Sequence, residues 1–113
     1  MSTELNILII TLATGEEVIA NLKKHVEQID GKPVEVCYNL VYPFVMKEVG
    51  REGDVQKITF MPWKKYSVDT QFLIGYNYVL NMCAPLPNVL ESYKQAVNEF
   101  IVTLSERAKS NDL

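Results

Sequence analysis

The segment at residues 63–67, Trp-Lys-Lys-Tyr-Ser, is the one place in the chain where basic and aromatic side chains interleave. Aromatic rings stack on nucleobases and lysine ammonium groups meet phosphates, so this composition is typical of single-stranded nucleic-acid binding. The alternative is a solvated loop that an aromatic side chain anchors to the core. The segment supplies four candidate RNA-binding residues: Trp63, Lys64, Lys65 and Tyr66.

Three further pairs have the chemistry of a base-binding site, and their members are Lys23, His25, Tyr38, Asn39, Tyr76 and Asn77. The first pair lies two residues apart, so a strand would present both side chains on one face. Each of the other two pairs sets a ring that can stack beside an amide that can hydrogen-bond a base. The alternatives are structural. The first pair would lie on the solvent-exposed face of an ordinary strand, and the two Tyr-Asn pairs would pack in the core.

Patterns for catalysis or metal binding are scarce in this chain. It has one histidine, and no serine or cysteine has an identifiable base near it in sequence. Glu16 and Glu17 are adjacent, so a strand would point them to opposite faces. Cys37 and Cys83 lie far apart without a metal-binding or redox spacing. We therefore expect no enzyme activity, no cofactor, no metal, and free thiols that pack as small hydrophobic side chains.

Length and composition favour one globular domain spanning residues 1–113, since 48% of the residues are hydrophobic and 22% are charged. The net charge of −3 means that any nucleic-acid binding would need a local basic patch. The start, MSTELNILII, lacks the basic region and cleavage site of a signal peptide. No apolar run reaches the roughly 18 residues of a membrane helix. We expect a cytoplasmic protein with no membrane association.

Apolar runs and turn signals predict five strands. They cover residues 5–14, 17–27, 34–46, 55–61 and 71–84, with turns at TGEE, DGKP and GREGD. The third run has the clearest period of two, and it predicts one shared face for Val34, Val36, Tyr38, Leu40, Tyr42, Phe44 and Met46. A strand this long must bend, because most strands have about 5–6 residues. The pattern thus favours a strongly bent antiparallel sheet that closes into a small barrel over about residues 5–84.

Two prolines and a glycine interrupt the predicted strands. Pro43 marks either a bulge that bends the third strand or a protected edge, because proline cannot donate a ladder hydrogen bond. Pro62 is expected to end the fourth strand. Gly75 predicts a bend or a close backbone approach within the fifth.

The period changes to helical after residue 87, which predicts a C-terminal helix over about residues 88–109. Asn88 and Glu91 have the spacing of an N-cap and its capping box. The apolar stripe consists of Leu90, Tyr93, Val97, Phe100 and Leu104. We expect this stripe to cover the open end of the barrel or a neighbouring subunit.

The segment ITLATGEEVIANLKKH resembles the first signature of the Sm-like proteins, the LSm and Hfq superfamily. That signature has an apolar strand, a turn with glycine, here Gly15, and a strand carrying a small residue, here Ala20. The TGEE turn, the proline in the third strand, the FMPW segment and a helix after AP resemble small Sm-like proteins of tailed phages of marine cyanobacteria. The resemblance covers roughly residues 7–100.

The resemblance implies a homo-oligomeric ring of about five to seven subunits, in which outer strands of neighbouring copies pair. Family members often bind RNA through pore-side loops that carry an aromatic or histidine, an asparagine and basic residues. For a phage protein the implied location is the host cytoplasm, and the implied role is RNA processing or regulation. The alternative is a structural or protein-interaction ring with no nucleic-acid partner.

The chain departs from the family pattern in three places. DGKPVEVCYN stands where D-x-x-x-N is usual, Ile74-Gly75 where Arg-Gly is usual, and the helix follows the strands. The net negative charge and the missing arginine favour the interaction ring, whereas the resemblance favours the RNA-binding ring.

Overall fold

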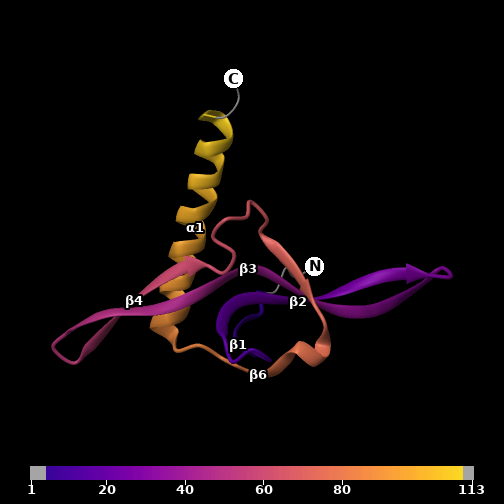
Figure 1. Ribbon diagram of the computed structural model, residues 1–113, viewed down its shortest axis with the longest axis horizontal. Helices are drawn as coiled ribbons and strands as arrows, with labels where there is room; N and C mark the ends of the chain where they lie inside the picture. The colour runs from indigo at the N-terminus through magenta and orange to yellow at the C-terminus, as the bar shows by residue number, and fades with distance from the viewer. Residues whose placement is uncertain (1–4, 111–113) are drawn as a thin grey trace.

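The computed structural model describes residues 5–110 of the chain, which form a mostly β structure with one C-terminal helix (Figure 1). The elements are β1 (Ile7–Leu12), β2 (Glu17–Ile29), β3 (Lys32–Glu52), β4 (Val55–Pro62), β5 (Gln71–Ile74), the 3₁₀ turn η1 (Tyr76–Tyr78), β6 (Val79–Cys83) and α1 (Pro87–Ser110). Their order confirms the predicted succession of strands followed by a helix.

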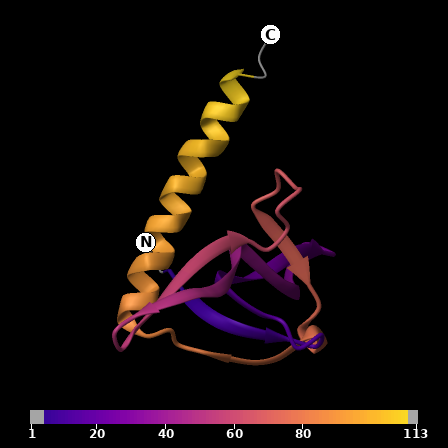
Figure 2. The ribbon, with the colours of Figure 1, turned by 60° about the vertical axis from the view of Figure 1, so that its left-hand side comes forward.

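The strands form one antiparallel sheet in the order β4-β3-β2-β1-β6, and the short β5 pairs with β3. The sheet curls into a half-barrel, and α1 lies against one side of it (Figure 2). Within residues 5–110, β4 pairs only with β3 and β6 only with β1. The predicted closed barrel is therefore open in one copy of the chain, between β4 and β6.

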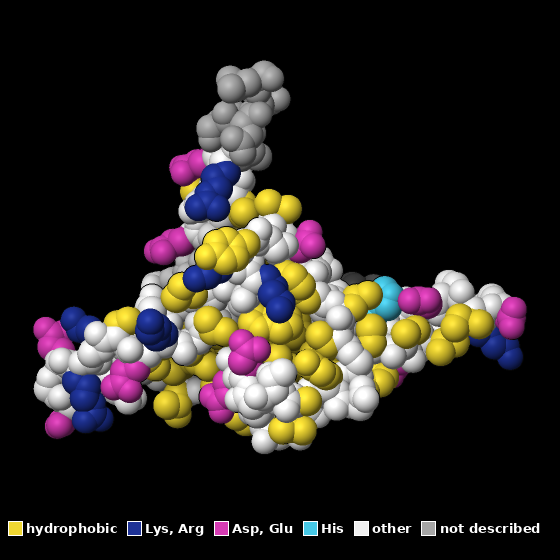
Figure 3. Space-filling view, in the orientation of Figure 1, with side chains coloured by type: hydrophobic (Ala, Val, Ile, Leu, Met, Phe, Trp, Pro, Cys, Tyr) yellow, Lys and Arg dark blue, Asp and Glu magenta, His cyan; other side chains and the backbone are white. Residues whose placement is uncertain are grey.

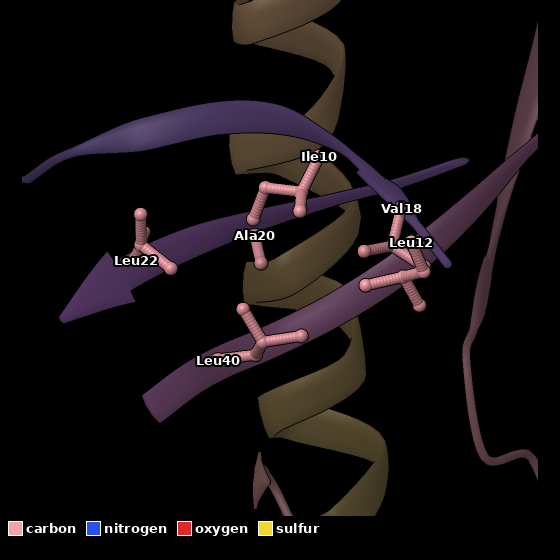
Figure 4. Packing of buried hydrophobic residues seen from close by; sticks show 6 residues of the cluster. All are labelled: Ile10, Leu12, Val18, Ala20, Leu22 and Leu40. Carbon is pink, nitrogen blue, oxygen red and sulfur yellow. The ribbon is translucent and has the colours of Figure 1, made fainter. Parts of the chain in front are cut away.

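Alternation along β1, β2 and β3 builds an inner cluster on one face of the sheet. Its buried members are Ile10, Leu12, Val18, Ala20, Leu22 and Leu40. Their side chains point toward one another from the three strands (Figure 4). Partly buried side chains from β1, β3, β5, β6 and the loop after β4 pack around them, namely Leu8, Tyr38, Val45, Trp63, Ile74 and Val79. The inner cluster explains the alternation of apolar and polar residues along these strands, because every second side chain points to the same face.

A bulge at residues 42–43 bends β3 in its middle. Between the pairs Ile19–Phe44 and Asn21–Val41, β3 has one more residue than β2. The tyrosine of the bulge has a φ of 51°, which is unusual for a residue with a side chain. Proline suits the next position because the ladder is already interrupted there. Of the two interpretations of this proline, the bulge is confirmed.

The bulge also reverses which face β3 presents, because one extra residue shifts the alternation by one. Leu40 lies in the inner cluster, but Tyr42, Phe44 and Met46 lie on the opposite face, against α1. The prediction that these residues share one face is therefore wrong beyond the bulge. Val45 takes the inward position instead. The prediction is also wrong at the start of the run, because a second register shift at Val36 puts Val34 on the opposite face from Tyr38 and Leu40.

A helix-side cluster fills the contact between the sheet and α1. Ile19, Phe44 and Tyr93 are its buried members, and Phe60 and Phe100 pack against them. The ring of Phe44 meets the ring of Tyr93 edge-on at 5.8 Å and that of Phe100 at 5.5 Å. Ile19, an apolar residue on the polar side of its strand pattern, is fully buried here. Both faces of the central sheet are thus covered by apolar packing.

The helix α1 begins one residue before its predicted start. The carbonyl oxygen of Leu86 accepts the N–H of Leu90 at 2.9 Å, so Leu86 occupies the cap position and Pro87 the first turn. Proline is favoured there because the first N–H groups of a helix have no partner within it. The predicted cap, Asn88, lies inside the first turn, so that prediction is wrong.

The apolar stripe of α1 packs on the outer face of the sheet, and its central residues Tyr93, Val97 and Phe100 make the contact. It does not pack on the inner cluster, so the stripe does not cover the open end of the half-barrel in one copy. The other alternative, contact with a neighbouring subunit, stays a prediction. The rest of the helix extends past the sheet (Figures 1 and 2).

The predicted fifth strand, residues 71–84, is broken in the structure. β5 stays on β3, η1 makes a turn, and β6 crosses to pair with β1. Gly75 begins the turn, and a Cβ at this position would lie 2.9 Å from Oδ1 of Asn77. Of the two alternatives for this glycine, the bend is confirmed, because the chain turns at η1 directly after it. The close contact is with a side chain and not with the backbone.

Candidate nucleic-acid interface

The loop at 63–67 follows β4 and is held at its base by Trp63. The backbone N–H of Trp63 donates to the carbonyl oxygen of Pro43 at 2.9 Å, and its indole Nε1–H donates to Oε1 of Glu16 at 3.3 Å. Its ring packs on the inner cluster and meets Phe72 at a centroid distance of 5.6 Å. Trp63 therefore acts as the anchor of the loop, as the structural alternative for this segment predicts.

The side chains of Lys64, Lys65 and Tyr66 are exposed to solvent, and Ser67 is half-buried. Nζ of Lys64 lies 4.3 Å from the ring centroid of Trp63, and Nζ of Lys65 lies 5.2 Å from that of Tyr66. Both distances fall within the range of cation–π attraction. The side chain of Tyr66 is 92% exposed. Residues 63–67 line an open hollow of about 480 Å³, so an exposed ring and two ammonium groups surround one accessible space.

Lys23 and His25 lie on β2, where acidic side chains accompany the basic ones. Nε2 of His25 lies 3.2 Å from Oε2 of Glu27, and Nζ of Lys24 lies 3.5 Å from Oε2 of Glu35. Figure 3 shows the same mixture of signs along both projecting hairpins. This neutralisation weakens the case for a phosphate-binding surface at β2.

Tyr38 and Tyr76 meet edge-on with a centroid distance of 4.7 Å and an interplanar angle of 88°. Tyr38 also packs on the inner cluster, which matches its structural interpretation. Partial desolvation, and secondarily the Glu35 carboxylate, raise the pKa of Tyr76. η1 thus brings together two rings that are far apart in sequence.

Asn39 donates from Nδ2 to Oε1 of Gln71 on β5, at 2.9 Å. Its Oδ1 atom is buried and accepts no hydrogen bond from the residues that the structure describes. Asn77 is exposed in η1. Gln71, which fixes the amide of Asn39, was not among the candidates, and no signal in the sequence links the two positions.

Among the candidate residues, all but Lys23, His25 and Asn77 fall into two contact groups. One is the loop at 63–67, and the other joins Tyr38 with Tyr76 and Asn39 with Gln71. Within the described residues, the hydrogen bonds, ion pairs and ring contacts given above do not connect the two groups. The loop is the group that combines exposed aromatic and basic side chains.

A groove of about 390 Å³ lies between the sheet and α1, and the sequence did not predict it. Its lining residues are Leu5, Ile7, Asn21, Val41, Tyr42, Tyr93, Lys94, Val97 and Asn98. Asn21 is only 9% exposed, and its Oδ1 accepts the N–H of Asn6 at 2.9 Å. The apolar residues on both sides of Asn21 in the sequence, Ala20 and Leu22, are the one available signal for its burial.

Both cysteines are free thiols, as predicted, with Cys37 half-buried and Cys83 exposed. The expectation of apolar packing is therefore wrong for Cys83, which lies on the end strand β6. Among residues 5–110, no three His, Cys, Asp or Glu side chains gather into a possible metal site. In the same range, no helix has the length and apolar content that a membrane span requires.

Comparison with known proteins places the chain in a family. No curated protein matches it. A family model described as a family of unknown function (DUF6561) matches residues 5–98, which include all six strands and the first half of α1. Because this match spans most of the chain, the protein belongs to the DUF6561 family.

Proposed function

We propose that the chain is an Sm-like, ring-forming protein in which the β4 edge of one copy pairs with the β6 edge of the next. The observation that carries this proposal is the open sheet, in which β4 and β6 each have one edge that no strand within residues 5–110 pairs with. Unpaired edges are templates for pairing with another chain. β6 also exposes apolar side chains, including Leu80 at 63%. Pairing would complete the sheet and cover this strand.

The features on which the Sm-like resemblance rests have structural roles that suit a strongly curved sheet. Gly15 has a φ of 91° in the turn between β1 and β2, which favours glycine. Ala20 is fully buried at the centre of the inner cluster, where a larger side chain would hold the strands apart. The bulge at 42–43 supplies the bend that a small barrel needs. These roles support the proposal without depending on an RNA site.

The mass of the protein in solution tests the ring. We expect light scattering after gel filtration to give one closed assembly at micromolar concentration. Leu80→Lys adds a charge at the β6 edge and should weaken assembly at least about tenfold. Val102→Lys, an apolar-to-lysine change at a residue of α1 that is 55% exposed, is the matched control and should assemble normally. A monomeric wild-type protein at tens of micromolar would contradict the proposal.

RNA binding by the loop at 63–67 is the second part of the proposed function. Its support is the exposed ring of Tyr66 beside the ammonium groups of Lys64 and Lys65. A ring repeats this loop once per copy, so modest contacts would add up through avidity. The competing interaction ring draws support from the net charge of −3 and from the paired charges on β2.

A further inference from the structure

The hairpin at residues 24–37, named here the β2–β3 arm, is a two-stranded ribbon that projects from the body of the protein. Among residues 5–110, the pairing of β1 with β2 ends at Asn21, with one further backbone bond from Leu22 to Asn6, and the pairing of β5 with β3 begins at Tyr38. Beyond these points β2 and β3 pair with each other alone. Figure 1 shows the arm as the long ribbon that extends to the right.

The turn of the arm is strongly encoded by the sequence. Asp30 and Gly31 both have positive φ angles, of 54° and 76°. Asp-Gly with two positive φ angles is the type I′ turn, whose twist matches that of a β-hairpin. The sequence therefore specifies the arm as a defined element.

The arm exposes apolar side chains on both faces. Ile29 and Val34 are diagonal neighbours on one face and are 48% and 39% exposed. On the other face Val26 lies diagonally from Pro33 and is 46% exposed. Two-stranded hairpins are at best marginally stable in water, and the exposed ion pairs of the arm add little. Covering these side chains would stabilise the arm.

The total surface of the chain is large enough for contacts with further copies. The chain exposes 8170 Å², and a compact monomer of 12.9 kDa exposes about 6,300 Å². The excess is roughly 1,900 Å², whereas one standard interface removes about 800 Å² from each partner. A copy within a ring has two neighbours and two such interfaces, which accounts for an excess of this size.

We propose that the β2–β3 arm is an assembly arm, which packs against a second copy of this chain and buries Ile29 and Val34. This inference rests on the proposed ring and adds to it a contact that edge pairing of β4 with β6 does not involve. The second copy supplies apolar surface to the arm, and the arm extends the interface beyond the sheet edge.

The double variant Ile29→Lys/Val34→Lys tests the arm. We expect it to keep the wild-type circular dichroism spectrum and to require at least about ten times more protein to assemble. Glu99→Lys changes the net charge by the same amount on the exposed side of α1, and it should assemble like the wild type. Assembly of the double variant at the wild-type concentration would overturn the inference.

Hydrogen exchange provides a test that does not depend on the double variant folding. Amides of residues 26–36 should exchange at least about tenfold more slowly in the assembled wild type than in the Leu80→Lys variant under monomeric conditions. Equal rates, or protection that appears only after RNA or another protein is added, would overturn the arm and leave the ring intact. A monomeric wild type would instead overturn the ring, and the arm with it.

Discussion

The hydroxyl of Tyr93 in α1 donates a 2.7 Å hydrogen bond to the backbone carbonyl oxygen of Tyr42, which lies in the bulge of β3. The carbonyl oxygen of Val41 lies 3.4 Å from the same hydroxyl. The bulge in turn places Phe44 on the helix side, where its ring meets that of Tyr93. The helix and the bulge therefore stabilise each other, and the curvature of the sheet depends on both.

Replacing Tyr93 with phenylalanine removes this hydrogen bond and keeps the aromatic packing. The carbonyl oxygen of Tyr42 then loses its buried partner, so we expect the free energy of unfolding to fall by about 1–3 kcal/mol. Urea denaturation followed by circular dichroism measures the change. Tyr78→Phe, at an exposed ring, is the control and should stay within about 0.5 kcal/mol of the wild type. An equal effect of both substitutions would show that the hydrogen bond from Tyr93 to Tyr42 does not stabilise the fold.

Burial raises the pKa of Tyr93 above its ordinary value of about 10. In alkaline solution the unfolded chain therefore loses this proton first, and it binds fewer protons than the folded state. Stability then falls as pH rises above about 10, and it is retained in full below that pH. Tyr93→Phe lacks the proton, so the stability difference between wild type and variant should shrink from pH 8 to pH 11. A constant difference across this range would show that Tyr93 ionises normally.

Local signals predicted much of the fold because each depends on a few neighbouring residues. The strand-turn-strand pattern around Gly15 and the bulge at Pro43 follow from backbone chemistry that is visible in the sequence. The face of β3 beyond Pro43 could not be predicted by counting alternate residues, because one extra residue inverts the pattern. The break at Gly75 likewise depends on which strand the chain pairs with next.

The candidate site was only partly predictable for a similar reason. The composition of residues 63–67 indicated an exposed basic and aromatic loop, and most of that loop is exposed. The roles of Trp63 and Asn39 depend on Glu16 and Gln71, which are distant in sequence and adjacent only in the fold. The ion pairs could not be predicted from the sequence either, because Lys24 and Glu35 come together only when β2 pairs with β3.

Gly31 tests whether the arm is specified by its turn. Its φ of 76° is costly for other residues, whereas a Cβ added there meets no atom within 4 Å. Gly31→Ala should thus cost about 1–2 kcal/mol through backbone strain alone. Urea denaturation measures the loss, with Lys32→Ala at the next exposed position as control. If the alanine variant is as stable as the control, the turn does not have the type I′ conformation.

Cys83 reports on the β6 edge. It is exposed in the single chain, and Cys37 is half-buried, so iodoacetamide should modify Cys83 faster under monomeric conditions. In the assembled protein, pairing at β6 should slow the modification of Cys83 at least about tenfold. Mass spectrometry of digests separates the two sites, and a Cys37→Ser variant gives the rate of Cys83 alone. Identical Cys83 rates in assembled and dissociated protein would exclude β6 from the interface.

RNA binding through the loop at 63–67 predicts different effects for its lysines and its exposed ring. Each phosphate contact to a single strand contributes about −0.7 to the slope of log affinity against log salt. Lys64→Ala/Lys65→Ala should weaken binding for all sequences and flatten this slope by roughly 1.4. Tyr66→Ala removes a stacking surface worth about 1–3 kcal/mol and should leave the slope unchanged. Fluorescence anisotropy with short U-rich and A-rich RNAs at several salt concentrations measures both quantities.

The control for this experiment is Lys57→Ala, which removes a lysine that is paired with Glu52 at 3.0 Å on the β3–β4 hairpin. It should leave RNA affinity and salt dependence near wild-type values. Every variant must keep the wild-type assembly mass, because loss of avidity would mimic loss of the site. Trp63 is unsuitable for substitution, since its ring packs on the inner cluster. If wild-type protein at micromolar concentration shows no salt-sensitive binding, the loop is no RNA site and the interaction ring becomes the better account.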